Sequence, residues 1–196
     1  TLPQNTDSPI GGLGSFFVLD SNLQVSGIKD NVMIGRVGGS GSKSRSETFA
    51  IIEDLLEFAS SLNLKDMESY KDIADLIDDS PIAESMDLHP RDIKALYNLV
   101  NDDLPLIISA NRASDLLKLI DLKLKYDLNL IIMGAQEAGL VADKIAKNNI
   151  PLIINPINNI PESFDELAAN IELAAYLEKQ GITLMFNAPR SHNFHL

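Results

Sequence analysis

Polar side chains follow four short apolar runs in the second half of the sequence, and their types suit ligand binding. The runs cover residues 104–111, 128–134, 150–155 and 182–187, and each is rich in Ile or Leu. The candidate ligand-binding residues at their ends are Ser109, Asn111, Arg112, Gln136, Glu137, Asn155 and Asn187. Converging amides with an arginine are suited to a small polar or carboxylate-bearing molecule. A second interpretation stays open, because Asn and Ser also cap the helices that follow strands.

Histidine is the other residue type that could do chemistry in this chain. His89 precedes Pro90, and we expect it to cap a helix at the surface. His192 follows the last apolar run, where barrel enzymes keep functional groups, so we predict it as the catalytic residue and a proton donor. His195 receives no role. Because the sequence holds neither His-x-His nor His-Glu-x-x-His, it offers no self-contained zinc site, and we assign no metal ligand.

The elements that must position these side chains are strands alternating with helices. Continuous apolar runs are typical of strands covered on both faces, as in a parallel sheet wrapped by helices. Helical patterns over 113–126, 136–147 and 164–180 separate the runs. We therefore predict an α/β fold with mainly parallel strands. It is either a fragment of a (β/α)8 TIM barrel or a doubly wound sheet, and in both folds ligands bind where strands end.

The first half of the chain predicts shorter elements around a flexible loop. Residues 1–14 have loop composition, 15–19 form a credible strand and 31–37 a weaker one. A Gly/Ser-rich loop at 38–44 precedes a helix from Ser46 to about Leu62.

Residues 65–103 carry eleven acidic and only four basic side chains. We predict two amphipathic helices here, joined by a turn at Ser80-Pro81, the second one beginning after His89-Pro90. This acidic helical segment belongs to a single barrel domain over 1–196. Because Thr1-Leu-Pro resembles the exit of a strand, we expect the sequence to be a piece of a longer chain.

Composition excludes several classes of function. The net charge of −12 repels phosphate backbones, so nucleic acid is an unsuitable partner. The longest apolar runs fall far short of the roughly 20 residues that a membrane span needs, so we expect a soluble protein with no membrane partner. The absence of cysteine excludes disulfides, thiolate zinc sites and thiol nucleophiles, and is compatible with either the cytoplasm or the periplasm. The expected partner is a small-molecule substrate.

Motifs in a fixed order along the chain resemble the amidohydrolase superfamily, and its imidazolonepropionase-like members in particular. The stretch 107–115 (IISANRASD) resembles a strand end that reads His-Ala-His-Arg-Ala-Asp-Asp in that family. Residues 133–138 (MGAQEA) resemble the next strand end, Asp-His-Gly-Thr-Glu-Ala. The helix at 141–143 (VAD), the strand at 150–152 (IPL) and the loop at 9–14 (PIGGLG) resemble family segments in matching order.

The resemblance implies a metal-dependent (β/α)8 barrel that hydrolyses C–N bonds in amides or cyclic amides. Leu104 would begin the fifth strand and Ile182 the eighth. Zinc or another divalent metal is the cofactor that the family implies. Its histidine ligands, however, correspond to Ser109 and Gly134, and its aspartate falls near Asn187. These are neutral, weak donors or none at all, so the usual metal ligands are absent from this chain.

Three hypotheses follow. The first is an amidohydrolase-like protein acting on C–N bonds of small polar substrates. The second is a catalytically degenerate barrel that binds a small amide or carboxylate ligand without hydrolysis. Arg112 would then pair the anion while Asn111, Gln136 and Asn155 orient it. The third is a doubly wound sheet with an unrelated ligand. If strands are missing from the chain, exposed apolar edges favour self-association into a homo-oligomer.

Overall fold

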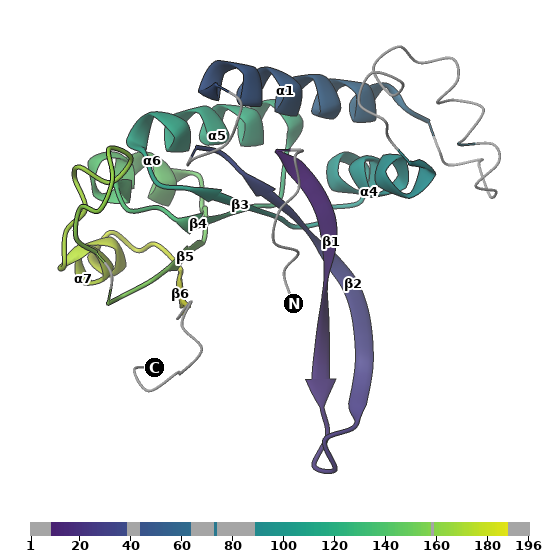
Figure 1. The fold of residues 1–196 in the computed structure, drawn as a ribbon, viewed down its shortest axis with the longest axis horizontal. Coiled ribbons are helices and arrows are strands. Elements are labelled where there is room, and N and C mark those ends of the chain that lie inside the picture. Colours follow the sequence, from purple (N-terminus) through teal and green to yellow (C-terminus); the bar gives the residue numbers. More distant parts are fainter. Residues whose placement is uncertain (1–8, 39–43, 64–72, 74–88, 158, 188–196) are drawn as a thin grey trace. The chain divides into compact units, whose positions relative to one another are not determined.

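A computed structural model of the chain describes residues 9–38, 44–63, 73, 89–157 and 159–187, and these residues form an α/β fold (Figure 1). They include six strands, labelled β1 to β6 in chain order. The chain divides into two compact units. The first comprises Thr1–Gly35, Ser46–Leu106 and Tyr126–Asn129, and the second comprises Arg36–Arg45, Ile107–Lys125 and Leu130–Leu196.

The first unit contains a long antiparallel hairpin. Strand β1 (Ile10–Leu19) pairs with β2 (Val25–Arg36), and the carboxylate of Asp20 accepts backbone N–H groups in the connecting turn. The two strands predicted from the sequence are thus confirmed, but both are longer than expected. The predicted loop was wrong over 10–14. Register shifts between Ile10 and Leu13 admit the two intervening glycines as an irregularity within the paired strand.

Two helices of this unit follow sequence rules closely. Helix α1 (Arg45–Ser61) buries Ile52, Leu55, Leu56 and Ala59 at helical spacing, as the pattern predicts. Helix α4 (Pro90–Asn101) begins with a capping box. His89 Nδ1 accepts the Arg91 N–H at 3.2 Å and the Asp92 carboxylate accepts the His89 N–H at 3.0 Å, so the capping role predicted for His89 is confirmed.

Two predicted features fall outside the described residues. The first helix of the acidic segment and the turn at Ser80-Pro81 lie within 64–88, of which only Ile73 is described, as a buried helical residue. Most of the Gly/Ser-rich loop, residues 39–43, is likewise outside.

The second unit has the predicted alternation of strands and helices (Figure 1). Each strand lies inside one of the four apolar runs. In chain order the elements are β3 (Leu106–Ala110), α5 (Ala113–Tyr126), β4 (Leu130–Gly134), the 3-10 turn η1 (Ala138–Val141), α6 (Ala142–Lys147), β5 (Leu152–Ile154), α7 (Leu173–Lys179) and β6 (Leu184–Phe186).

The strands of this unit are parallel. Strand β4 pairs with β5 through Ile132 and Leu152, and β5 pairs with β6 through Leu152 and Leu184. Ile132, Leu152 and Ile154 are fully buried, which accounts for the unbroken apolar runs. Parallel pairing aligns the carboxyl ends of the strands at one edge of the sheet, and the predicted ligand-binding residues follow those ends.

One predicted helix is too long. The pattern over 164–180 predicts a continuous helix, whereas α7 begins at Leu173. Before it the chain makes turns, and Phe164, Leu167 and Ile171 are exposed. These apolar residues keep helical spacing without a surface to cover, so no packing supports a helix there. Among the described residues, no helix is both long and apolar enough to cross a membrane.

Candidate functional site

Backbone hydrogen bonds join the segments at the ends of β3 and β4. The N–H of Ala135 donates to the carbonyl of Ala110 at 2.8 Å, and the N–H of Glu137 donates to the carbonyl of Asn111 at 3.0 Å. To reach this geometry the chain leaves β4 through two consecutive residues with positive φ, Gly134 at 92° and Ala135 at 50°. Backbone in this region is costly for residues other than glycine, and such strain is common at functional sites.

Asn111 lies directly over Gly134. A Cβ atom on Gly134 would stand 2.3 Å from Asn111 Oδ1, so the Asn111 amide occupies the space that any side chain at 134 would need. The nitrogen of the same amide, Nδ2, donates a hydrogen bond to Glu166 Oε1 at 2.8 Å. Asn111 therefore connects the end of β3 to a segment that follows β5.

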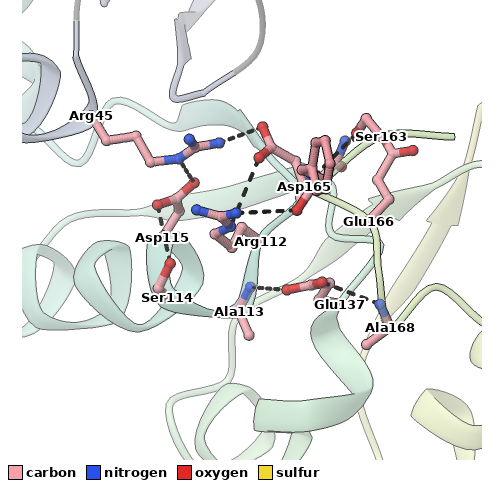
Figure 2. Close-up of polar contacts among 12 residues, drawn as sticks. Arg45, Arg112, Ala113, Ser114, Asp115, Glu137, Ser163, Asp165, Glu166 and Ala168 are labelled. Carbon is pink, nitrogen blue, oxygen red and sulfur yellow. Dashed lines mark hydrogen bonds and ion pairs between the residues drawn. The ribbon is translucent and has the colours of Figure 1, made fainter. Parts of the chain in front are cut away.

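That segment, residues 162–168, is called the strap below (Figure 2). Arg112 holds it at two points, because its Nη2 donates to the carbonyl of Phe164 at 3.2 Å and its Nε lies 3.8 Å from Asp165 Oδ1. Within the strap, the Asp165 N–H donates to Ser163 Oγ at 3.2 Å and fixes a local turn. The strap thus runs beside the residues that follow β3.

Arg45 joins two carboxylates in one charged cluster (Figure 2). Its Nε donates to Asp115 Oδ2 at 3.0 Å, and its Nη2 forms an ion pair with Asp165 Oδ2. Asp115 is only 3% exposed, so the arginine supplies the compensation that a buried carboxylate requires. The hydrogen bond that Arg45 donates to Asp115 is the main cause that raises the pKa of Arg45, and desolvation opposes it. Arg45 consequently stays charged across the working pH range.

Glu137 uses both carboxylate oxygens to tie two backbone segments. Oε2 accepts the Ala113 N–H at 2.9 Å at the start of α5, and Oε1 accepts the Ala168 N–H at 3.2 Å at the end of the strap (Figure 2). The side chain is buried. Charge-assisted hydrogen bonds of this kind are about twice as strong as neutral ones. Glu137 therefore fixes the strap to the start of α5.

Three of the residues predicted from the sequence are thus brought together at the strap: Asn111, Arg112 and Glu137. Gln136, the next predicted residue, is buried beside Glu137 in the chain.

The remaining predicted residues are not joined to the strap by any contact described for them. Asn155 Oδ1 accepts the N–H of Ile157 at 3.1 Å in a local turn. Ser109 accepts the Val37 N–H through its carbonyl at 2.8 Å, and Asn187 donates its N–H to Ile154 at 3.0 Å. The predicted catalytic residue His192 lies outside the described residues.

Sequence reasoning missed the partners of these residues. Asp165 and Glu166 fell in the first turn of the helix predicted over 164–180, and Arg45 lay between the predicted loop at 38–44 and the helix predicted from Ser46. The Ser163-x-Asp165 spacing is a turn signal that could have interrupted the helix prediction. No local signal pairs Arg45 with Asp115, because seventy residues separate them.

The described residues do not fit the divalent metal that the family resemblance implies. Across the described parts of the chain, no group of three or more His, Asp or Glu side chains is arranged to hold a metal ion. The nearby carboxylates of Asp115, Glu137 and Asp165 already accept from guanidinium or backbone N–H groups. Ser109 and Asn111 offer only neutral oxygens. No catalytic step is therefore derived through a metal here.

Gly38 lies against the charged cluster, so replacing it with alanine tests how much the cluster contributes to stability. Its φ is 79°, and an added Cβ would lie 2.9 Å from Arg45 Nη2 and 3.3 Å from Asp165 Oδ2. We expect Gly38→Ala to lower the free energy of unfolding by about 2 kcal/mol, combining left-handed strain with displacement of the ion pair. Urea unfolding followed by circular dichroism measures this.

Gly181→Ala is the matched control for Gly38→Ala. Its φ is 77°, with nothing within 4 Å of the added Cβ, so it isolates the backbone contribution. Equal losses of stability in the two variants would show that the charged cluster does not respond to the methyl group at 38.

The α/β fold of this chain, with its mainly parallel strands, is shared with a solved structure. The chain is similar to the crystal structure of an amidohydrolase from Thermotoga maritima MSB8, with a TM-score of 0.69 and 17% sequence identity. The match covers 93% of this chain and 48% of that one, so the chain spans about half the length of the solved structure. At this identity the similarity concerns the fold. No protein-family model and no curated protein matches the sequence.

Proposed function

We propose that this chain is part of an amidohydrolase-like (β/α)8 barrel, related to the hydrolases of C–N bonds in amides and cyclic amides. The observation that carries the proposal is the fold match over 93% of the chain to an amidohydrolase. The motif order along 107–152 supports it independently and favours the imidazolonepropionase-like members. Under this proposal, the four strands of the second unit are the fifth to eighth strands of the barrel, and a small polar substrate binds at their carboxyl ends.

The residues of the proposed site would divide into two roles. Asn111 and Arg112 would orient the polar end of the substrate, because an amide and a guanidinium together can bind a carboxylate or a carbonyl. His192 would donate the proton to the leaving nitrogen, because it follows the last apolar run, where barrel enzymes keep functional groups.

A second candidate is a barrel that binds a small carboxylate without hydrolysing it. The observation that favours it is the chemistry of the strand ends. Asn111 and Arg112 already contact carboxylates of the chain itself, whereas the positions of the family's metal-binding histidines are Ser109 and Gly134. Such a site can bind an anion without activating water.

Hydrolysis and metal content of the protein decide between the two candidates. The purified protein is incubated with a panel of linear amides, hydantoins and imidazolones, and ammonia or carboxylate release is measured alongside metal content. Turnover that a chelator abolishes and His192→Ala reduces supports the hydrolase. Binding of carboxylates without turnover, in protein that holds no stoichiometric metal, supports the second candidate.

Arg112 is expected to matter in both cases. Replacing it with alanine should weaken binding of an anionic ligand about tenfold or more, because a charge-assisted hydrogen bond is lost. The measured quantity is KM for a turned-over substrate or Kd for a bound carboxylate. Arg91→Ala on α4 removes the same charge from an exposed position and is the control. An unchanged KM or Kd in Arg112→Ala would contradict the assigned role.

A further inference from the structure

The strap presents two adjacent carboxylates to the side chains proposed to bind ligand. Asp165 lies between Arg45 and Arg112 (Figure 2). Glu166 accepts a hydrogen bond from the amide of Asn111 at 2.8 Å. Two cations and one amide donor therefore face two carboxylates that are adjacent in the sequence. This is the arrangement of an anion-binding site whose occupant belongs to the same chain.

The attachment of the strap is polar and partly open to solvent. The side chains of Arg112 and Asp165 are 37% and 20% exposed, and their closest atoms are 3.8 Å apart. Ion pairs of this kind hold weakly and are screened by salt. The apolar side chains of the strap do not compensate, since Phe164 is 80% exposed and Leu167 is also exposed. No buried apolar surface at Phe164 or Leu167 opposes release of the strap.

Two other contacts of the charged cluster do not involve the strap. Asp115 is buried and remains with Arg45 through the 3.0 Å hydrogen bond, and Glu137 keeps the Ala113 N–H when Ala168 leaves. Release of the strap therefore frees one face of Arg45, together with Arg112 and Asn111, without breaking the contacts that hold α5. What remains is a preformed site for two carboxylates.

We propose that Asp165 and Glu166 are internal stand-ins for a ligand dicarboxylate, and that such a ligand binds Arg112 and Asn111 by displacing the strap. The inference rests on the proposed ligand-binding role of Asn111 and Arg112 and adds the ligand class and a competing element. A dicarboxylate replaces both internal carboxylates at once, whereas a monocarboxylate replaces only one. The strap thus sets the affinity of the site by competition.

Succinate is the probe, with acetate as the monocarboxylate, in buffers of matched ionic strength adjusted with chloride. Titration calorimetry measures Kd, and hydrogen exchange of the Ala168 amide reports strap release, because that N–H is bonded to Glu137 in the closed state. We expect succinate to bind more tightly than acetate and to accelerate exchange of the Ala168 amide. No succinate binding, or exchange that chloride accelerates equally, overturns the proposal.

Substitutions in the strap test directly whether its carboxylates compete with succinate. Asp165→Asn removes one internal competitor and should lower the Kd for succinate about five- to tenfold, the size expected for losing two weak ion pairs, one with Arg45 and one with Arg112. Glu162→Gln makes the same charge change in the same strap, where the described contact of residue 162 is through its backbone N–H, and should leave Kd unchanged. Equal effects of the two variants, or no effect of Asp165→Asn, overturn the proposal.

The outcome is separable from that of the proposed hydrolysis. Succinate binding that releases the strap in a protein without amide turnover supports this inference and contradicts the hydrolase. Turnover of amides with an immobile strap and no response to succinate supports the hydrolase and overturns this inference. Arg112→Gln, checked for folding by circular dichroism, should lose the succinate response, and retention of that response also counts against the proposal.

Discussion

Replacing Glu137 with alanine is expected to lower the free energy of unfolding by about 3 to 5 kcal/mol, the largest effect we predict for a single substitution here. The carboxylate accepts the N–H of Ala113 at 2.9 Å and that of Ala168 at 3.2 Å. Each is a hydrogen bond to a charged group worth about 1.5 to 3 kcal/mol, and its loss leaves a backbone donor without its partner. Urea unfolding followed at 222 nm measures the change.

Two further variants test whether the loss of stability comes from the two hydrogen bonds that Glu137 accepts. Glu137→Gln keeps one carbonyl acceptor but turns a donor toward the other N–H, so we expect a loss smaller than for alanine, about 1 to 3 kcal/mol. Glu178→Ala on α7 removes an exposed carboxylate and should change stability by less than about 0.5 kcal/mol. A Glu137→Ala protein as stable as Glu178→Ala would contradict the bridging role derived from these hydrogen bonds.

The parallel half of the fold could be predicted from the sequence because its strands are short and β3, β4 and β5 are largely buried, although β6 is more exposed. Ile132 and Leu152 pair across β4 and β5 and are fully buried, so the apolar run is unbroken and its length gives the strand. Helix α5 begins and ends where the pattern predicts, since Leu116 and Leu119 lie on its buried side. Local composition suffices for such elements.

The strap and the start of β1 could not be predicted by the same reasoning. Phe164 and Leu167 have helical spacing but are exposed, and a local pattern cannot report which side chains the rest of the fold covers. Ile10 lies next to glycines that indicate a loop, yet it pairs with Gly35 across an irregular register. In both cases the deciding interactions involve partners distant in sequence.

The residues of the candidate site could be predicted from the sequence, but their partners could not, for a related reason. Position after a buried strand identifies Asn111, Arg112 and Glu137 as residues at the ligand-binding edge, and the parallel topology brings them together. Their partners lie 24 or more residues away in the sequence and include Asp165 and Glu166. Titration with succinate tests whether a ligand replaces those contacts.

Gly134→Ala is the second substitution with a large expected effect, about 3 kcal/mol of lost stability. The backbone at 134 has a φ of 92°, which costs an L-residue about 1 to 2 kcal/mol. The added Cβ would lie 2.3 Å from Asn111 Oδ1, so the Asn111 side chain must move and its hydrogen bond to Glu166 is weakened or lost. Thermal and urea unfolding of the variant measure the sum.

A double-mutant cycle separates the two contributions at Gly134. In an Asn111→Ala background the obstructing amide is gone, so Gly134→Ala should cost only the backbone term, about 1 to 2 kcal/mol, as Gly181→Ala does at a φ of 77°. A cost that stays at 3 kcal/mol without Asn111 would show that the strain lies in the backbone alone. The same contact limits every other residue type at 134, because any Cβ there would collide with Asn111 Oδ1. Introducing a larger side chain at this strand end therefore requires changing both residues together.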